Sequence, residues 1–378
     1  MKKILFTTNI PAPYTVDFFN GLGEKFDLTV LFERKTATNR EDKWLTGIAS
    51  NFRAIYLEGI NIGEEMGFCP SVIRYLKKNK YDCIIVGNYS SPTGMLEIEY
   101  MRYNKIPFYI HVDGGIPGKT IGMRAIIKKH FLGNAAGYMS PGRVTDKYLM
   151  TYGKKNGLMY HYPFTSIYSK DVLSKPLIDS EKYEIRKSMG LRESYIYKPL
   201  VISVGSVIYR KGYDILLDAI PYIDKNVNFL IVGGSITSEL EEKVEKYNLN
   251  NVSFWAFQDH DKVKQLLKAA DLFVLPTRYD IWGLVINEAM AAGQAIVTTD
   301  YCVAGLELVS DNKNGYIVPA ENSMELAKKI NDYFLMDDIS KRAFCECSLD
   351  IINNYTLEKM IDIYAENIVK AIENVNNN

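Results

Sequence analysis

The sequence predicts an α/β fold with two domains of nearly equal size, each built on a doubly wound, mostly parallel sheet. The chain has 378 residues, more than one hydrophobic core usually organises. Short apolar runs rich in β-branched residues alternate with helical segments along most of it. The alternation stops at residues 160–176, where Pro163 and Pro176 interrupt it, and then restarts. We therefore expect one domain on each side of a linker.

The first domain is expected to span residues 1–165. Its β-rich runs are 3–8, 28–32, 54–57, 83–87, 108–112 and 138–140, and its helical segments are 13–22, 72–79, 92–104, 123–132 and 143–152. Pro13 can begin the first helix, because its missing N–H would have no intrahelical partner there. Ligands of such sheets bind beyond the carboxyl ends of the strands.

The second domain is expected to span residues 178–356. Its predicted strands are 200–204, 229–232, 252–255, 272–275 and 295–298, and its predicted helices are 182–189, 214–220, 240–247, 263–270 and 284–292. A further helix is expected over 357–374, after Thr356. Both halves therefore have the pattern of Rossmann-like domains.

The charge balance and the cysteines exclude several classes of protein. Lys plus Arg and Asp plus Glu each number 45, so the formal net charge is zero and we expect no nucleic-acid partner. The 5 cysteines are scattered and odd in number, which fits reduced thiols in the cytosol better than a disulfide framework. We expect no metal site, and Cys345 with Cys347 alone does not indicate zinc.

The chain is expected to be cytoplasmic. Lys2 and Lys3 precede an apolar run, but Ile4–Phe6 gives way at once to polar residues and is too short for a secretory signal. No run of about 18 apolar residues occurs, so no transmembrane helix is expected.

Residues 276–293 carry the strongest functional signal. The apolar run 272–275 stops at Pro276, a loop ends at Gly283, and a helix follows. The amides of Gly283 and Leu284 then lie at a helix N-terminus, which favours a phosphate. Glu288 on the second turn can accept bonds from a ribose diol, and Asp280 on the loop can contact sugar hydroxyls. An ordinary strand-loop-helix unit with a solvated Glu is the alternative.

Further glycines and cations follow the preceding strands. Gly205 ends the run 200–204, and Arg210 and Lys211 stand before the next helix. Gly234 follows the run 229–232, and Phe257 follows 252–255. Each has an ordinary interpretation as well: a solvated Arg-Lys pair, a simple turn, and a core aromatic.

Together these segments resemble the retaining GT-B glycosyltransferases of family 4, also called glycosyl transferases group 1. Residues 280–288 resemble the E-x7-E signature of that family, with Asp280 in place of the first Glu. The resemblance implies that Glu288 holds the nucleotide ribose, that Gly283 and Leu284 hold the diphosphate, and that Asp280 touches the donor sugar. Shortening this acid by one methylene leaves the sugar contact open.

The resemblance also assigns the other loops. Lys211 matches the lysine that neutralises the donor phosphate, and Arg210 substitutes for an arginine that the family has at the position of Ser206. Gly205, Gly234 and Phe257 would line the nucleotide pocket. The GT-B fold has two Rossmann-like domains facing a central cleft, and the helix 357–374 is expected to pack back on the first domain, as in the family.

In the first domain, His111 and Asp113 end the run 108–112 and precede two glycines. Family members often have a His or Asp here, beside donor and acceptor. Asp113 could accept the acceptor's proton. His111 could instead be a buried neutral residue, because alternate strand positions face opposite sides.

The helix 123–132 is amphipathic and basic. Lys119, Arg124, Lys128 and Lys129 lie on or near it, among apolar residues. A helix with one face on the core explains this pattern. The functional alternative is peripheral contact with anionic lipid headgroups on the cytoplasmic face of a membrane.

The sequence thus predicts a metal-independent, retaining glycosyltransferase. Its substrate would be a nucleotide-diphosphate sugar, most simply a UDP-sugar, with no bound cofactor. The acceptor would be a glycan or lipid-linked glycan of bacterial surface polysaccharide. Two alternatives stay open: a nucleotide-sugar epimerase or hydrolase of the same fold, and a catalytically silent glycosyltransferase-like partner, which the replacements Asp280 and Ser206 keep plausible.

Overall fold

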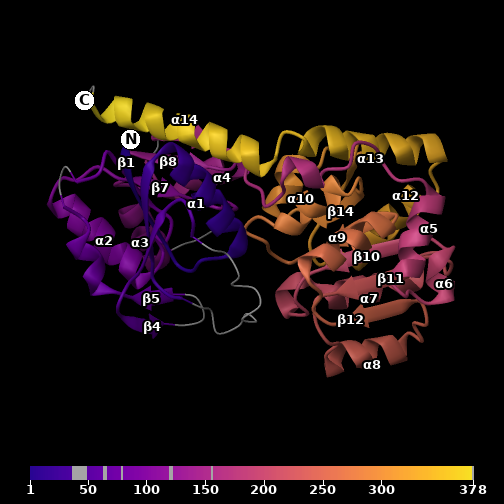
Figure 1. The fold of residues 1–378 in the computed structure, drawn as a ribbon. Coiled ribbons are helices and arrows are strands. Elements are labelled where there is room, and N and C mark those ends of the chain that lie inside the picture. The colour runs from indigo at the N-terminus through magenta and orange to yellow at the C-terminus, as the bar shows by residue number, and fades with distance from the viewer. Residues whose placement is uncertain (36–48, 63–65, 78–79, 119–121, 155, 377–378) are drawn as a thin grey trace. The chain divides into compact units, whose positions relative to one another are not determined.

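The chain divides into two compact units. Its structure, a computed structural model, describes residues 1–35, 49–62, 66–77, 80–118, 122–154 and 156–376. Unit 1 comprises Met1–Phe164 and Leu357–Asn378, and unit 2 comprises Thr165–Thr356. Each unit has its own parallel sheet with helices packed against it (Figure 1).

The sheet of unit 1 has the strand order β3-β2-β1-β6-β7-β8-β9, with all neighbours parallel. Its strands are β1 (Lys3–Thr8), β2 (Asp27–Phe32), β3 (Arg53–Tyr56), β6 (Cys83–Val86), β7 (Tyr109–His111), β8 (Gly137–Ser140) and β9 (Leu158–His161). Central strands of such sheets are covered on both faces, and β6 is accordingly buried along its whole length. Strand β9 extends into the stretch that we assigned to the linker.

The helices of unit 1 are α1 (Pro13–Lys25), α2 (Pro92–Tyr103), α3 (Met123–Leu132), α4 (Arg143–Tyr152) and α14 (Leu357–Asn376). Ser91 caps α2 by accepting a hydrogen bond from the Gly94 amide at 2.9 Å. The helix expected at 72–79 is instead the 3-10 helix η2 (Pro70–Arg74), and residues 78–79 lie outside the described part. The predicted segment was too short to form a stable α-helix on local propensity alone.

A short antiparallel hairpin in unit 1 was not expected from the sequence. It joins β4 (Ile60–Ile62) to β5 (Met66–Phe68). Strands of three residues are too short to show the alternation of apolar and polar residues that predicts a strand.

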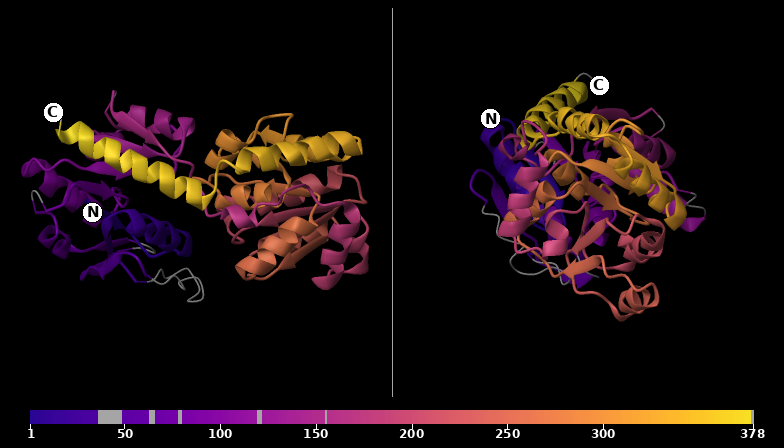
Figure 2. Two further views of the ribbon diagram at one scale, coloured as in Figure 1. Left: turned by 45° about the horizontal axis from the view of Figure 1, so that its top comes forward. Right: turned by 90° about the vertical axis from the view of Figure 1, so that its right-hand side faces the viewer.

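The C-terminal helix α14 packs on unit 1, alongside α1 and β9 (Figures 1 and 2). The Tyr109 hydroxyl donates a hydrogen bond to the Ala371 carbonyl at 2.7 Å, and Asn367 Nδ2 donates to the His161 carbonyl at 2.7 Å. No helix in the described part of the chain is long and apolar enough to span a bilayer.

The sheet of unit 2 has the order β12-β11-β10-β13-β14-β15, again with all neighbours parallel. Its strands are β10 (Leu200–Val204), β11 (Asn228–Val232), β12 (Val252–Trp255), β13 (Leu272–Leu275), β14 (Ala295–Thr299) and β15 (Gly315–Val318). The chain leaves β10 towards β11 and β12, and later continues on the other side of β10 with β13. The strand order therefore reverses between β10 and β13, and ligands of doubly wound sheets bind at such a point.

The α-helices of unit 2 are α5 (Asp179–Ser188), α6 (Glu193–Ile196), α7 (Tyr213–Ala219), α8 (Ser238–Lys246), α9 (His260–Ala269), α10 (Leu284–Ala291), α11 (Val303–Leu308), α12 (Ser323–Phe334) and α13 (Asp338–Ile352). Short 3-10 helices are η3 (Ser169–Asp171), η4 (Tyr209–Lys211) and η5 (Ile220–Tyr222). Every strand and helix predicted for this unit is present, with ends shifted by a few residues. Strand β15 and helices α6, α11 and α12 were not predicted, and no bounds were predicted for α13.

A chain of buried hydrogen bonds lies where β1 and β6 end in unit 1. Glu33 accepts hydrogen bonds from Asn88 Nδ2 at 2.5 Å, from the Gly67 amide at 2.6 Å and from the Ser91 hydroxyl. Thr7 Oγ1 lies 2.8 Å from Asn88 Oδ1 and 2.7 Å from Glu97 Oε1. A hydroxyl carries one hydrogen, so Thr7 donates to Asn88 and Glu97 must supply the hydrogen of the other bond.

Glu97 is therefore a protonated carboxylic acid in the folded chain. Its side chain is completely buried, and this burial, together with the nearby charge of Glu33, raises the pKa of Glu97 well above its ordinary value. The proton links β1, α2 and the loop after β6.

We expect Glu97→Gln to remove part of the pH dependence of stability. The unfolded chain loses this proton near pH 4.5, whereas the folded chain keeps it to higher pH. The parent should therefore lose stability as the pH rises above 4.5. The amide of Gln donates to Thr7 without titrating. Urea unfolding at pH 5 to 9 measures the difference, and exposed Glu373→Gln is the control. Equal pH slopes for parent and Glu97→Gln would contradict the protonated acid.

Candidate functional site

Two loops of unit 2 meet at the point where the strand order reverses. The loop after β10 starts at Gly205 and contains η4, which carries Arg210 and Lys211. A Cβ on Gly205 would lie 3.2 Å from Lys211 Cε and 3.2 Å from the Tyr213 hydroxyl. The glycine thus leaves room for the lysine side chain at the end of the strand.

Gly212 allows this loop to approach the loop after β13. Its φ is +70°, which a side chain disfavours, and a Cβ there would lie 2.1 Å from the Pro276 carbonyl oxygen. The Arg278 amide donates to the Arg210 carbonyl at 2.8 Å, and the Thr277 hydroxyl donates to the same carbonyl at 3.0 Å. The two loops are therefore held together by hydrogen bonds to the Arg210 carbonyl.

Arg210, Lys211 and Asp280 form one cluster across these loops. Lys211 Nζ lies 2.7 Å from Asp280 Oδ2, and Arg210 donates to Asp280 Oδ1 at 2.5 Å. The side chains of Lys211 and Asp280 are only 11% and 10% exposed, whereas that of Arg210 is 44% exposed. Two cations share one carboxylate, so the cluster carries a net positive charge.

Arg278 holds the cluster in place and was missed in the sequence analysis. Its guanidinium donates to both oxygens of Asp214, at 2.8 and 2.7 Å, and to the Tyr209 carbonyl at 2.7 Å. It also lies 3.8 Å from the centre of the Tyr209 ring. The sequence shows Arg278 two residues before Asp280 and Asp214 three residues after Lys211. Spacing alone does not reveal that these two residues pair.

The N-terminus of α10 is adjacent to this cluster in the chain. Gly283 caps the helix with a φ of +101°, and a Cβ there would lie 2.8 Å from Cys302 Sγ. Trp282 is buried and donates from Nε1 to Asn287 Oδ1 at 2.9 Å, which fixes the loop to the helix. The first amides of a helix have no intrahelical acceptor, so those of Gly283 and Leu284 suit an anion.

Glu288 lies on the second turn of α10. Burial raises the pKa of Glu288 to about 7, although the positive charges of Lys264 and Lys211 oppose the rise. The carboxyl group can therefore change its charge near neutral pH.

Gly234 and Phe257 lie farther along the same edge of the sheet. A Cβ on Gly234 would lie 3.1 Å from Val207 Cγ2, so this glycine packs against the loop after β10. Phe257 follows β12, the edge strand, which is separated from β10 by β11. Its side chain is exposed, and the core alternative for this position is wrong.

His111 and Asp113 lie together in unit 1, after β7. His111 Nε2 lies 2.8 Å from Asp113 Oδ1, and His111 Nδ1 lies 3.0 Å from the Tyr364 hydroxyl. The Tyr162 ring stacks on the imidazole, with centroids 5.3 Å apart. His111 is buried, as the alternative interpretation had it, while the side chain of Asp113 is 45% exposed and borders a cavity of about 30 Å³.

Helix α3 is exposed on most of its surface. Leu132 is its buried residue, and Met123, Ile126 and Ile127 are exposed together with Arg124 and Lys129. Lys128 instead packs over the rings of Tyr148 and Tyr152, at 5.2 and 4.9 Å. Lys119 lies outside the described residues. Ala125 and Phe131 pack against the core of unit 1 together with Leu132, so one face of the helix lies on the core, as the ordinary interpretation has it, and the rest of the helix is exposed.

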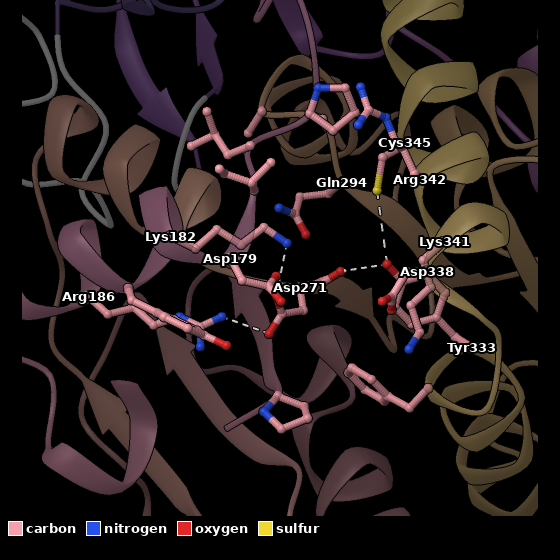
Figure 3. A pocket seen from close by; sticks show the side chains of 18 of the residues that line it. Asp179, Lys182, Arg186, Asp271, Gln294, Tyr333, Asp338, Lys341, Arg342 and Cys345 are labelled. Atoms are coloured by element: carbon pink, nitrogen blue, oxygen red, sulfur yellow. Dashed lines mark hydrogen bonds and ion pairs between the residues drawn. The ribbon is translucent and has the colours of Figure 1, made fainter. Parts of the chain in front are cut away.

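A larger pocket of about 360 Å³ lies at the opposite edge of the unit 2 sheet, around Asp271 (Figure 3). Asp271 accepts hydrogen bonds from Lys182 at 2.9 Å, Arg186 at 2.7 Å and the Leu200 amide at 2.8 Å. Arg186 also donates to the carbonyls of Ala269, Tyr195, Ile196 and Lys198. These groups fix the amino ends of β10 and β13. Ligands of such sheets bind at the other end, beyond the carboxyl ends of the strands.

Among the described residues, no group of three or more His, Cys, Asp or Glu side chains is arranged to hold a metal ion. The groups proposed to contact a ligand at the carboxyl ends of the unit 2 strands are cations, helix amides and the acids Asp280 and Glu288. Cations and amides suit a diphosphate.

Comparison with known proteins agrees with this geometry. Residues 185–345 match the family Glycosyl transferases group 1. This segment lies within unit 2 and contains every proposed nucleotide-binding residue.

The chain is also similar to curated glycosyltransferases. It is 30% identical over 200 residues to an uncharacterized glycosyltransferase of Methanocaldococcus jannaschii, covering 52% of this chain and 48% of the relative. It is 24% identical over 200 residues to the N,N'-diacetylbacillosaminyl-diphospho-undecaprenol alpha-1,3-N-acetylgalactosaminyltransferase of Campylobacter jejuni, covering 52% and 51%. The chain spans about half the length of the curated relatives it matches.

The fold is shared with a solved structure along nearly the whole chain. Anabaena HepE in complex with UDP superposes with a TM-score of 0.76 at 18% identity, covering 98% of this chain and 100% of HepE. The predicted fold class, GT-B with two Rossmann-like domains, is confirmed.

Proposed function

We propose that this protein is a retaining glycosyltransferase of family 4 that moves a sugar from a nucleotide-diphosphate donor, a UDP-sugar, to a glycan or lipid-linked glycan acceptor. The observation that carries the proposal is the convergence of Arg210, Lys211 and Asp280 at the point where the strand order reverses. A net positive cluster beside the N-terminus of α10 suits the diphosphate of such a donor.

The comparisons support the donor and acceptor classes. The family matched by residues 185–345 is one of glycosyl transferases, and HepE was solved with UDP. The name of the Campylobacter jejuni relative describes transfer to a diphospho-undecaprenol acceptor. A lipid-linked acceptor of bacterial surface polysaccharide synthesis is therefore the acceptor that we propose.

The proposed reaction breaks the bond between the anomeric carbon of the sugar and the distal phosphate oxygen. The acceptor oxygen forms the new bond on the same face, and its proton passes to the departing phosphate. Lys211, Arg210 and the amides of Gly283 and Leu284 would stabilise the charge that develops on the diphosphate. Glu288 would accept hydrogen bonds from the ribose diol, while Gly205, Gly234 and Phe257 would line the nucleotide site.

On the acceptor side, Asp113 and His111 are the groups that we propose. The exposed half of the Asp113 carboxylate can accept a hydrogen bond from an acceptor hydroxyl. His111 is held by Tyr364 and Asp113 and would fix the orientation of that carboxylate.

Two rival functions make different products. A nucleotide-sugar epimerase would isomerise a UDP-sugar without an acceptor, and a hydrolase would release free sugar. A catalytically silent partner would bind ligand and make no product. Product analysis of UDP-sugars with and without a glycan acceptor distinguishes these functions from transfer, which needs both substrates.

We expect Lys211→Ala and Glu288→Ala to weaken UDP binding. Removing Lys211 should also slow turnover roughly a hundredfold, because the loss of one preorganised donor costs about 3 kcal/mol of transition-state stabilisation.

Because the pKa of Glu288 is about 7, the UDP affinity of the parent should fall as pH drops below 7, and that of Glu288→Ala should change less. Calorimetry from pH 6 to 8 and initial rates measure these effects. Variants that bind UDP and turn over like the parent would place the nucleotide site elsewhere.

We expect transfer to be independent of a divalent metal. Arg210, Lys211 and the α10 amides supply the positive charge that a cation would otherwise bring to the diphosphate. The transfer rate should be the same with EDTA as with added magnesium or manganese. A rate that EDTA abolishes and manganese restores would contradict this role of the two cations.

We also propose that α3 contacts anionic lipid. The exposed Met123, Ile126 and Ile127 stand beside Arg124 and Lys129, a combination that suits a membrane interface. Lys128 contributes less to this surface because it packs on two tyrosine rings.

The double variant Arg124→Gln/Lys129→Gln should bind acidic vesicles more weakly than the parent. Each charge near such a surface contributes about 1 kcal/mol, so the loss should approach thirtyfold at low salt. Cosedimentation with phosphatidylglycerol vesicles measures it, and Lys328→Gln/Lys341→Gln in unit 2 is the charge-matched control. Parent binding that is absent, or insensitive to salt, would refute the membrane contact.

A further inference from the structure

The Arg210–Lys211–Asp280 cluster has a property that donor binding alone does not explain. Both oxygens of Asp280 are engaged by the two cations assigned to the diphosphate, at 2.5 and 2.7 Å. The carboxylate thus occupies the hydrogen-bond donors with which a phosphate would make its strongest contacts. Its negative charge would also lie next to a phosphate bound there.

We propose that Asp280 competes with the diphosphate for Arg210 and Lys211 and thereby makes the site prefer the intact donor over the nucleotide product. This inference rests on the proposed function and adds discrimination between donor and product to it. When a diphosphate arrives, the two cations exchange Asp280 for phosphate oxygens. Asp280 is then left either to a sugar hydroxyl or to no partner.

The exchange is possible because the cluster can change partners without unfolding. Arg210 lies on a 3-10 helix and its side chain is 44% exposed, so its guanidinium can turn to a ligand. Lys211 has three N–H donors, and Asp280 uses one of them. The Asp280 backbone stays fixed, since its amide donates to the Tyr301 carbonyl at 2.9 Å and its carbonyl accepts from Val303 at 3.3 Å.

The two ligands differ in what they offer to the released carboxylate. A UDP-sugar brings sugar hydroxyls, which can donate to Asp280 and replace the bonds that it lost. Free UDP brings none, so the carboxylate faces the phosphates unpaired in a site where its side chain is only 10% exposed. Charge repulsion then weakens UDP relative to the donor and favours release of the product.

Calorimetry with UDP and with the UDP-sugar that the parent uses tests the proposal. Asp280→Asn keeps the size of the side chain and removes its charge, so it should bind UDP about tenfold tighter. The UDP-sugar should gain less, and the preference of the site for donor over UDP should fall. Asp280→Glu keeps the charge and should retain the preference of the parent. Asp218→Asn, which removes a charge from an ion pair with Lys243, is the control and should bind UDP like the parent.

A double-mutant cycle with Lys211→Met identifies the cause. If Asp280 acts by competing for the cations, the tightening caused by Asp280→Asn should shrink when Lys211 is absent. Should Asp280→Asn prove unstable, Asp280→Ser replaces it, with the thermal unfolding of each variant as the check on folding. If the parent binds UDP and Asp280→Asn binds it equally well or more weakly, the competition is overturned and the proposed function still stands. No UDP binding by the folded parent would overturn both.

Discussion

The structure of the candidate site depends on one electrostatic constraint, the need of Lys211 for a counter-charge at the end of β10. A lysine with an 11% exposed side chain is costly to keep charged unless a carboxylate faces it. Asp280 meets that need from the next loop along the sheet edge, at 2.7 Å. The pair therefore fixes the distance between the loops that follow β10 and β13, and the cap of α10 follows three residues after Asp280. The Asp280 carboxylate therefore both neutralises Lys211 and holds the two loops at a fixed distance.

Such a short distance is possible only with particular backbones around it. Gly212 and Gly283 both have left-handed φ values, and a Cβ on either would collide with the neighbouring segment. Arg278 then closes the arrangement by binding Asp214 through two parallel hydrogen bonds and by covering the Tyr209 ring. Because Gly212 and Arg278 hold the loop after β10 against the loop after β13, the cations are preorganised before any ligand arrives, as electrostatic stabilisation of a leaving group requires.

The sequence predicted the parts of this site but not their pairing. Buried parallel strands such as β10 and β13 appear as uninterrupted apolar runs, and glycine at a strand end indicates a loop, so Gly205, Lys211, Asp280 and Glu288 could be placed on elements. Nothing local distinguishes a carboxylate that faces a sugar from one that faces two cations, because that depends on contacts between residues about 70 positions apart. The partners of Arg278 were hidden for the same reason. Segments with few residues, such as η2 and the β4–β5 hairpin, were mispredicted or missed because their hydrophobic pattern is too short to define a period.

Two clusters of similar composition in unit 2 show how environment separates a structural role from a functional one. Asp271 and Asp280 are each bound by a lysine and an arginine. Arg186 beside Asp271 is 1% exposed and also satisfies four backbone carbonyls, so moving it would leave several buried acceptors unpaired. Arg210 beside Asp280 is 44% exposed and makes one such contact, to the Tyr279 carbonyl. The first cluster holds strands together, whereas the second can give up its internal carboxylate for an anionic ligand at modest cost, as the proposed binding and release of a diphosphate requires.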